Sequence, residues 1–267
     1  MLKQRVITAL VIAPIVLALV FFAPDWLFTL AMLGVALVGA WEWSALAGKP
    51  GRDSRLMLVG LFGMLAVAGG WLQRGLPYPQ GLLIYTVLAL VWWGASLIWM
   101  GISRREFPYP VKVLCGVLTL LPSLAAVVAI RSTSPWYLLI LLLLTSGADI
   151  GAFFAGRAFG RHKLAPLISP GKTWEGVVGG VLLVAVVAAI ASLWLPVVAP
   201  LFILLCIGVA LLSVVGDLSE SLFKRQAGMK DSGSLFPGHG GVLDRVDSLT
   251  AAAPLFWLGL HCLGVLP

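Results

Sequence analysis

The chain has 267 residues, of which 60% are hydrophobic and 11% are charged, and its mean hydropathy is +1.03. Soluble domains carry about a quarter charged residues and slightly under half apolar ones, so this composition excludes a water-soluble globular protein. The 18 Lys and Arg residues outnumber the 11 Asp and Glu residues and give a net charge of +7. In so apolar a chain, this excess indicates membrane topology rather than a nucleic-acid partner.

Nine apolar runs are long enough to cross a hydrocarbon layer about 30 Å thick as helices. They lie at about 6–22, 26–47, 56–73, 81–102, 111–130, 135–156, 176–197, 200–219 and 249–266. The sequence therefore predicts an all-α integral membrane protein with about nine transmembrane helices. No small-residue cleavage site follows the first run, so we expect an uncleaved anchor rather than a signal peptide.

The basic residues indicate the orientation of these spans. When the loops alternate across nine spans, sixteen of the 18 basic residues share the side of the N-terminus, and Arg74 and Arg131 lie opposite. Because cytoplasmic loops are enriched in Lys and Arg, we expect a cytoplasmic N-terminus. The two long connections, 157–175 and 220–248, then face the cytoplasm and are expected to form the active site. We divide the chain into an N-terminal packing half, 1–134, and a C-terminal catalytic half, 135–267.

Acidic residues concentrate in the second half of the chain. Seven of the eleven lie between positions 149 and 247, namely Asp149, Glu175, Asp217, Glu220, Asp231, Asp244 and Asp247. Asp149 stands near the cytoplasmic end of the sixth span, where a carboxylate costs at least a few kcal/mol unless a polar cavity, metal or cation compensates it. It is therefore either a functional carboxylate or half of a structural ion pair with Arg157, two helical turns away.

The connection before the seventh span contains a candidate anion site. We predict that Ser169 caps the helix and that Pro170 is its first residue, which brings Lys172 and Thr173 to a helix N-terminus. The glycine that a P-loop requires five residues before Gly171 is absent and no strand is expected to precede it, which excludes a P-loop. The alternative is a basic topology signal that contacts lipid headgroups.

A polar stripe emerges from the eighth span at spacings i, i+4, i+7, i+8 and i+11, which share one helix face. It consists of Ser213, Asp217, Glu220, Ser221 and Lys224. Phosphates meet carboxylates through a cation, so this mixture predicts Mg²⁺ bound between acid and phosphate. The following loop adds Gly240 and Gly241, which permit close backbone approach to a ligand, and then Asp244 and Asp247 on one face beside Arg245.

Histidine and cysteine carry weaker signals. His239 is either a catalytic base or a hydrogen-bonding loop residue, and we expect structural roles for His162 and His261. The cysteines stand alone in apolar runs and predict neither a disulfide framework nor a zinc site. They are Cys115, Cys206 and Cys262.

The last loop also carries a family resemblance. It reads Ser221-x-Phe223-Lys224-Arg225-x4-Lys230-Asp231-x-Gly233-x2-Phe236-Pro237-x-His239-Gly240-Gly241-Val242-x-Asp244-Arg245-Val246-Asp247. This pattern resembles the signature of the phosphatidate cytidylyltransferases, also called CDP-diacylglycerol synthases. The segments Ser169-Pro170-x-Lys172-Thr173-x-Glu175-Gly176 and Gly216-Asp217 agree, and the similarity covers essentially the whole chain. Gly171 departs from it, since many relatives carry a second lysine there, which puts one phosphate contact in doubt.

The resemblance implies transfer of a cytidylyl group from CTP to phosphatidate with Mg²⁺, at the cytoplasmic face of a bacterial membrane, and dimerisation through glycine-rich spans. The expected metal ligands are Asp149, Asp217 and Asp244, with Asp247 and Asp231 in reserve. The residues expected to hold phosphates are Lys172, Lys224, Arg225, Lys230 and Arg245. The remaining substrate contacts are expected from Ser169, Thr173, Ser221, Gly240 and Gly241. The expected catalytic residues are Asp217, Asp244, His239 and the five basic residues that hold phosphates.

Three rival interpretations stay open. A transporter or channel would explain acids in membrane spans, although transporters place them near the bilayer midplane rather than in loops at one surface. An ether-lipid cytidylyltransferase keeps the chemistry and changes the lipid. A membrane scaffold predicts no nucleotide binding and leaves the acidic stripe unexplained.

Overall fold

The computed structural model describes residues 2–75, 79–102, 106–236, 238 and 240–266. Within them the chain forms nine helices and one short hairpin. The helices are α1 (Leu2–Phe22), α2 (Asp25–Leu46), α3 (Arg52–Gly75), α4 (Gln80–Ile102), α5 (Tyr109–Thr133), α6 (Pro135–Phe159), α7 (Trp174–Ala191), α8 (Ala199–Gln226) and α9 (Leu243–Cys262). The strands are β1 (Lys163–Ala165) and β2 (Ser169–Thr173), which pair antiparallel.

Helices α2 to α8 are each long and apolar enough to cross a membrane. The predicted helical, multi-pass membrane architecture is thus confirmed. The count of nine spans and the cytoplasmic N-terminus stay predictions. Helix α9 carries two aspartates and an arginine in its first two turns, and charged residues of this kind are costly in hydrocarbon.

Three predicted boundaries differ from the structure by six or seven residues. Helix α8 continues seven residues beyond the expected end at 219, α9 begins six residues before the expected start at 249, and α7 ends at Ala191 rather than 197. Helices α8 and α9 are longer at these ends because hydropathy marks only the apolar part of a helix, whereas backbone hydrogen bonds continue through polar residues. Helix α7 is shorter because its apolar run continues through turn residues toward Pro196, which cannot continue a helix. The connection predicted at 220–248 therefore shrinks to residues 227–242.

The prediction that Ser169 caps the seventh helix is wrong. Residues 169–173 pair with β1, and Thr173 is the cap instead, since its hydroxyl accepts the Gly176 N–H at 3.1 Å. Both positions carry a capping side chain, and pairing with β1 decides between them. Lys172 and Thr173 consequently lie on a strand that leads into the helix, so the expectation that no strand precedes this segment is also wrong. A P-loop stays excluded because position 166 is proline where that motif requires glycine.

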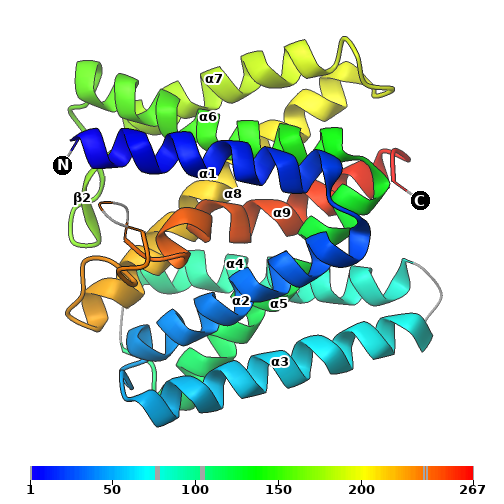
Figure 1. The fold of residues 1–267 in the computed structure, drawn as a ribbon. Helices are drawn as coiled ribbons and strands as arrows, with labels where there is room; N and C mark the ends of the chain where they lie inside the picture. The colour runs from blue at the N-terminus through cyan, green and yellow to red at the C-terminus, as the bar shows by residue number, and fades with distance from the viewer. Residues whose placement is uncertain (1, 76–78, 103–105, 237, 239, 267) are drawn as a thin grey trace.

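Figure 1 shows α8 and α9 in the middle of the molecule, with α6 and α7 on one side and α2 and α3 on the other. Helices α6 and α7 approach closely because glycines face each other: a Cβ at Gly151 would stand 2.9 Å from the Gly180 Cα, and one at Gly180 would stand 2.6 Å from the Ala148 carbonyl oxygen. Small residues at such crossings are typical of membrane helix pairs. The hairpin connects α6 to α7, so the packing of this pair positions Lys172.

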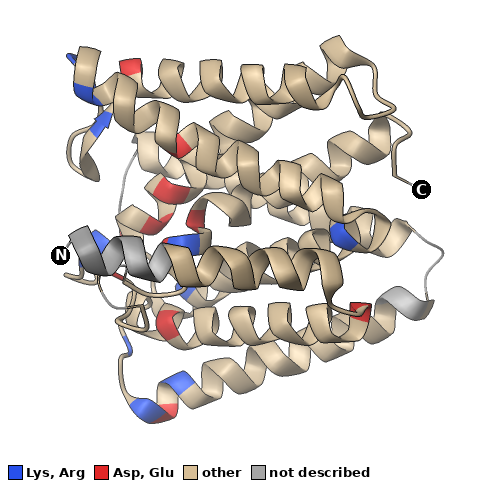
Figure 2. Cartoon of the chain, turned by 45° about the horizontal axis from the view of Figure 1, so that its top comes forward, with Lys and Arg blue, Asp and Glu red and all other residues tan. Residues whose placement is uncertain are grey.

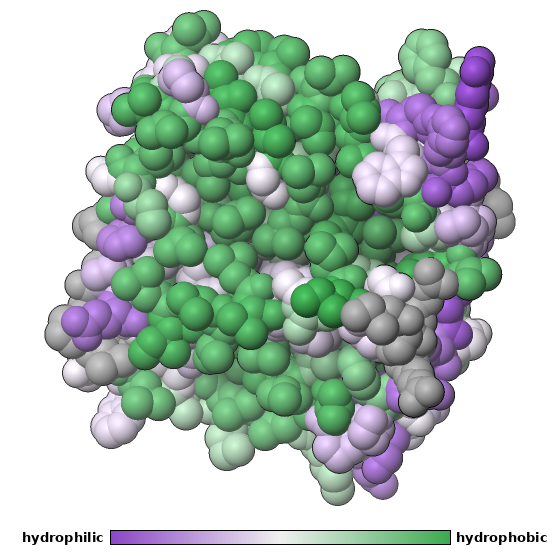
Figure 3. Space-filling model, turned by 180° about the vertical axis from the view of Figure 1, so that it is seen from behind, coloured by the Kyte–Doolittle hydropathy of each residue, from purple (hydrophilic) through white to green (hydrophobic). Residues whose placement is uncertain are grey.

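Large apolar side chains cover much of the outer surface. Examples are Trp71 on α3, Phe154 on α6 and Leu182 on α7, which are all more than half exposed. Figure 3 shows a broad hydrophobic face with hydrophilic residues toward its edges. A surface of this kind is solvated by lipid rather than by water.

Candidate active site

Carboxylates from three helices gather toward the end of the bundle where most of the basic residues lie (Figure 2). Asp149 comes from α6, Asp217 and Glu220 from α8, and Asp244 and Asp247 from α9. Electrostatic interactions connect Asp217 with both Asp149 and Asp247. The structure thus brings together side chains that are nearly 100 positions apart in the sequence.

Asp217 is the carboxylate that joins the hairpin to α8. Its Oδ2 forms an ion pair with Lys172 of β2, and its Oδ1 accepts a hydrogen bond from the Ser221 hydroxyl at 3.2 Å. About a quarter of each side chain in the ion pair is exposed, 25% for Lys172 and 24% for Asp217. Both groups are therefore accessible to a ligand.

Lys224 lies deeper, between α8 and α9. Its ammonium group is 2.7 Å from Asp244 Oδ1 and 3.1 Å from Glu220 Oε1, and its side chain is 10% exposed. All three side chains of this ion-paired group are buried. Its ion-pair partners are both carboxylates, and its predicted contact with a phosphate stays a prediction.

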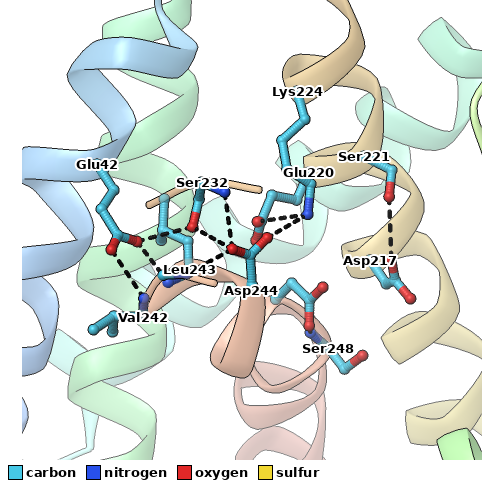
Figure 4. A network of polar contacts seen from close by, with 12 residues as sticks. Glu42, Asp217, Glu220, Ser221, Lys224, Ser232, Val242, Leu243, Asp244 and Ser248 are labelled. Carbon is cyan, nitrogen blue, oxygen red and sulfur yellow. Dashed lines mark hydrogen bonds and ion pairs between the residues drawn. The ribbon is translucent and has the colours of Figure 1, made fainter. Parts of the chain in front are cut away.

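Asp244 organises the loop before α9 (Figure 4). Its Oδ2 accepts the N–H groups of Ser232 and Gly241, each at 2.8 Å, and lies 2.9 Å from the Ser232 hydroxyl. Gly240 has φ +83°, and a Cβ there would collide with Asp244. Glycine at position 240 thus permits both the positive φ and the close approach of the Asp244 side chain.

Sequence reasoning missed Glu42 of α2 as part of this loop. Its carboxylate accepts the N–H groups of Val242 at 3.0 Å and Leu243 at 2.9 Å, and the Ser232 hydroxyl at 2.9 Å. The signal that could have found it is a lone acid in an otherwise uncharged span, since such residues require compensation. The partners themselves lie some 190 to 200 positions away and could not be read from the sequence.

Helix α2 is fixed beside the site by α5. The Trp43 indole donates to the Lys112 carbonyl at 2.8 Å, and a Cβ at Gly116 would collide with that indole. The Lys112 ammonium in turn bonds the exposed Glu106 at 2.6 Å. This hydrogen bond and the lysine charge lower the pKa of the Glu106 carboxyl group.

The other predicted site residues are mostly exposed. Arg225, Lys230, Asp231 and Arg245 lie at the surface, and the Arg225 side chain donates to the Ile168 carbonyl at 3.4 Å, which ties α8 to the hairpin. Asp149 interacts with Asp217, Lys172 and Arg245, which disfavours the alternative in which it pairs with Arg157. Ser169 lies on β2.

The remaining predictions concern histidine and cysteine. His162 Nδ1 lies 2.7 Å from Glu175, and His261 stacks on Trp257 with ring centroids 5.4 Å apart. The prediction for His239 lies outside the described residues. Cys115 and Cys206 are buried thiols, whereas Cys262 is exposed, and the three are free.

The charges of this site suit a divalent cation. Among the described residues, five carboxylates, Asp149, Asp217, Glu220, Asp244 and Asp247, interact with three cationic side chains, Lys172, Lys224 and Arg245. In their charged forms they leave an excess of two negative charges. Within the described part of the chain, no group of three or more Asp, Glu, His or Cys side chains is arranged to hold a metal ion by itself. Mg²⁺ does not need such a group of three protein ligands, because it commonly binds one or two carboxylates together with water and substrate phosphates.

Comparison with known proteins identifies the family. The model of the cytidylyltransferase family matches residues 3–263. The chain belongs to the cytidylyltransferase family. Within that family, it is 40% identical to a phosphatidate cytidylyltransferase of Haemophilus influenzae, over 96% of this chain and 97% of that protein. It is 41% identical to a phosphatidate cytidylyltransferase of Pseudomonas aeruginosa, over 96% of both chains, and 36% identical to one of Brucella suis, over 96% of this chain and 92% of that protein. The resemblance found in the sequence is confirmed.

Proposed function

We propose that this protein transfers the cytidylyl group of CTP to phosphatidate and forms CDP-diacylglycerol and pyrophosphate. The observation that carries this proposal is similarity along nearly the whole chain to proteins named phosphatidate cytidylyltransferase. The gathering of carboxylates and cations at one end of a membrane helix bundle supports it. A lipid-borne phosphate and a water-borne nucleotide meet at such a boundary.

In the proposed reaction a phosphate oxygen of phosphatidate attacks the α-phosphorus of CTP. The bond between the α-phosphorus and the oxygen bridging to the β-phosphorus breaks, and pyrophosphate leaves with that oxygen. The attacking phosphate is already anionic, so no protein nucleophile is required. Catalysis then consists mainly of positioning and of neutralising charge.

Basic residues at the rim of the site have the chemistry to hold these phosphates. Lys172 and Arg245 neighbour the carboxylate group, and Arg225 and Lys230 are exposed around it. Each contact between such a residue and a phosphate is a charge-assisted hydrogen bond. Ser221 holds Asp217 and orients its carboxylate.

Mg²⁺ is the proposed cofactor. Asp217, with Asp149 and Asp247, is the best-placed set of ligands because these three interact electrostatically and Asp217 is partly exposed. Asp244 and Asp231 are further candidates. When bound, the ion neutralises phosphate charge and orients the reacting groups.

The orientation and assembly of the protein complete the proposal. We place the N-terminus and the site on the cytoplasmic side of a bacterial inner membrane, because the basic residues concentrate on that side of the predicted spans. We also propose a homodimer.

The proposal is tested with purified protein in mixed micelles. Pyrophosphate release should require CTP, phosphatidate and Mg²⁺ together, and a chelator should abolish it. Release without any lipid acceptor would overturn the proposal. Faster release with an unsaturated ether analogue than with phosphatidate would assign the ether-lipid reaction instead.

A further inference from the structure

We propose that Glu42 is a positioning residue for the reaction, which fixes Asp244 and the loop before α9 from a helix of the N-terminal half. The inference rests on the proposed function. It concerns a residue that lies outside the signature pattern and is only 5% exposed. Glu42 therefore acts through other groups.

The first part of the argument is the beginning of α9. The first N–H groups of a helix have no partner within the helix and require one from elsewhere. The residue at the cap position is Val242, whose side chain cannot accept a hydrogen bond. Glu42 supplies the missing acceptors, one oxygen for the Val242 N–H and the other for the Leu243 N–H. Its negative charge also stands at the positive end of the helix dipole.

The second part is the link between Glu42 and Asp244. The Ser232 hydroxyl lies 2.9 Å from Glu42 Oε2 and 2.9 Å from Asp244 Oδ2 (Figure 4). A hydroxyl carries one proton, so it donates to one carboxylate at a time. The backbone N–H of Ser232 donates to Asp244 as well, at 2.8 Å. Displacing Glu42 would thus move Ser232 and, with it, two contacts of Asp244.

The third part of the argument is the space that the loop before α9 leaves for the Glu42 carboxylate. A Cβ at Gly233 or at Gly241 would collide with the Glu42 carboxyl group. Two glycines from the loop therefore close around a side chain of another helix. The hydrogen bond from the Trp43 indole to the Lys112 carbonyl holds the residue next to Glu42 against α5. The backbone that carries Glu42 is therefore fixed in place.

The variant Glu42→Gln probes this role with almost no change in shape. Both carboxylate oxygens accept a backbone N–H. In either orientation the amide nitrogen of glutamine faces one of these donors, because an amide has a single acceptor oxygen. One N–H loses its partner and the carboxylate charge is removed, while the volume stays the same.

We expect Glu42→Gln to lower kcat by about a hundredfold, the scale of a displacement of about 1 Å in a catalytic group. The KM values for CTP and phosphatidate should change much less, because the Glu42 side chain is buried and acts through the loop. In hydrogen exchange, amides of residues 232 and 241–243 should exchange faster than in the unaltered protein, while those of residues 163–173 should not. The matched control is Asp53→Asn, an exposed carboxylate at the start of α3, which should change neither measurement.

The outcomes separate this inference from the proposed function. A folded Glu42→Gln protein with unchanged kcat and unchanged exchange would overturn the positioning role. If the unaltered protein showed no cytidylyl transfer, the proposed function would fail, yet the exchange measurement, which needs no turnover, would still report whether Glu42 orders the loop.

A second variant covers the case in which Glu42→Gln does not fold. Gly233→Ala brings a methyl group against the Glu42 carboxyl group from the loop side and should also lower kcat with faster exchange at 241–243. Its control is Gly34→Ala on α2, where an added Cβ meets no atom within 4 Å. Equal behaviour of the two glycine variants would contradict the inference.

Discussion

At the scale of single residues, the site consists of carboxylates and cationic side chains that pair toward one end of the helix bundle. Asp217 is accessible and paired with Lys172, whereas Asp244 is buried and held by Lys224 and by the backbone of its own loop. Both residues belong to the set that the sequence singled out. Their surroundings differ, which predicts that Asp217 acts on ligands and that Asp244 also maintains the loop.

Asp217→Asn removes one negative charge at the accessible ion pair. Pyrophosphate release should fall by about a hundredfold or more, because the transition state loses an electrostatic contact of a kind that is worth several kcal/mol. Thermal unfolding should change little, since asparagine keeps the size of the side chain. Full activity of Asp217→Asn at saturating Mg²⁺ would remove this residue from the proposed metal set.

Thr173→Ala removes the cap of α7. The Gly176 N–H then loses its acceptor, and the free energy of unfolding should fall by about 1 kcal/mol, the typical value of a helix cap. Thermal unfolding in detergent measures the effect, and Thr173→Ser should restore stability. Thr133→Ala, at the exposed end of α5, is the control. Equal losses in both alanine variants would argue against Thr173 as the cap.

At the scale of elements, the packing of α6 against α7 sets where the hairpin and Lys172 stand. Glycines along both helices permit this contact, and an added Cβ at Gly151 would meet the Gly179 carbonyl oxygen at 2.6 Å. The sequence shows these glycines, and glycines in membrane spans permit close approach of helices. It does not show which helix approaches, since any neighbouring span would satisfy the same pattern.

Gly151→Ala should therefore force the two helices apart. We expect a loss of about 1–3 kcal/mol in the free energy of unfolding, as for other overpacked sites, measured by thermal unfolding. Gly147→Ala is the control on the same helix, because its Cβ would meet the nearest atom at 4.0 Å, an ordinary contact. A loss as large at Gly147 would show that helix propensity or lipid contact, rather than the α6–α7 packing, decides the effect.

At the scale of the whole molecule, basic residues concentrate toward one end of the bundle (Figure 2). The carboxylate group lies toward the same end. If that end faces the cytoplasm, CTP reaches the site without crossing the membrane. The proposed orientation would thus meet a requirement of the reaction and agrees with the distribution of basic residues along the sequence.

Cysteine labelling in intact cells tests this orientation. In a Cys262→Ser background, Ser132→Cys in the last turn of α5 should react with a membrane-impermeant maleimide. Ser234→Cys, in the loop before α9, should react after the membrane is opened. Both positions are exposed in the structure. The reverse pattern would place the site on the outer side of the membrane and contradict the proposed topology.

The sequence by itself determined the membrane class, the approximate positions of the helices and the family. These follow from composition, from the length of apolar runs and from a motif that is local in the chain. Tertiary structure decided the cap of α7, because strand pairing across residues 163–173 overrides the local capping signal at Ser169. It also decided the partners of Asp149, Asp217 and Glu42, which interact across distant segments. A side chain can be recognised as costly in a membrane from its sequence position, but the group that compensates it is known only when the helices are packed.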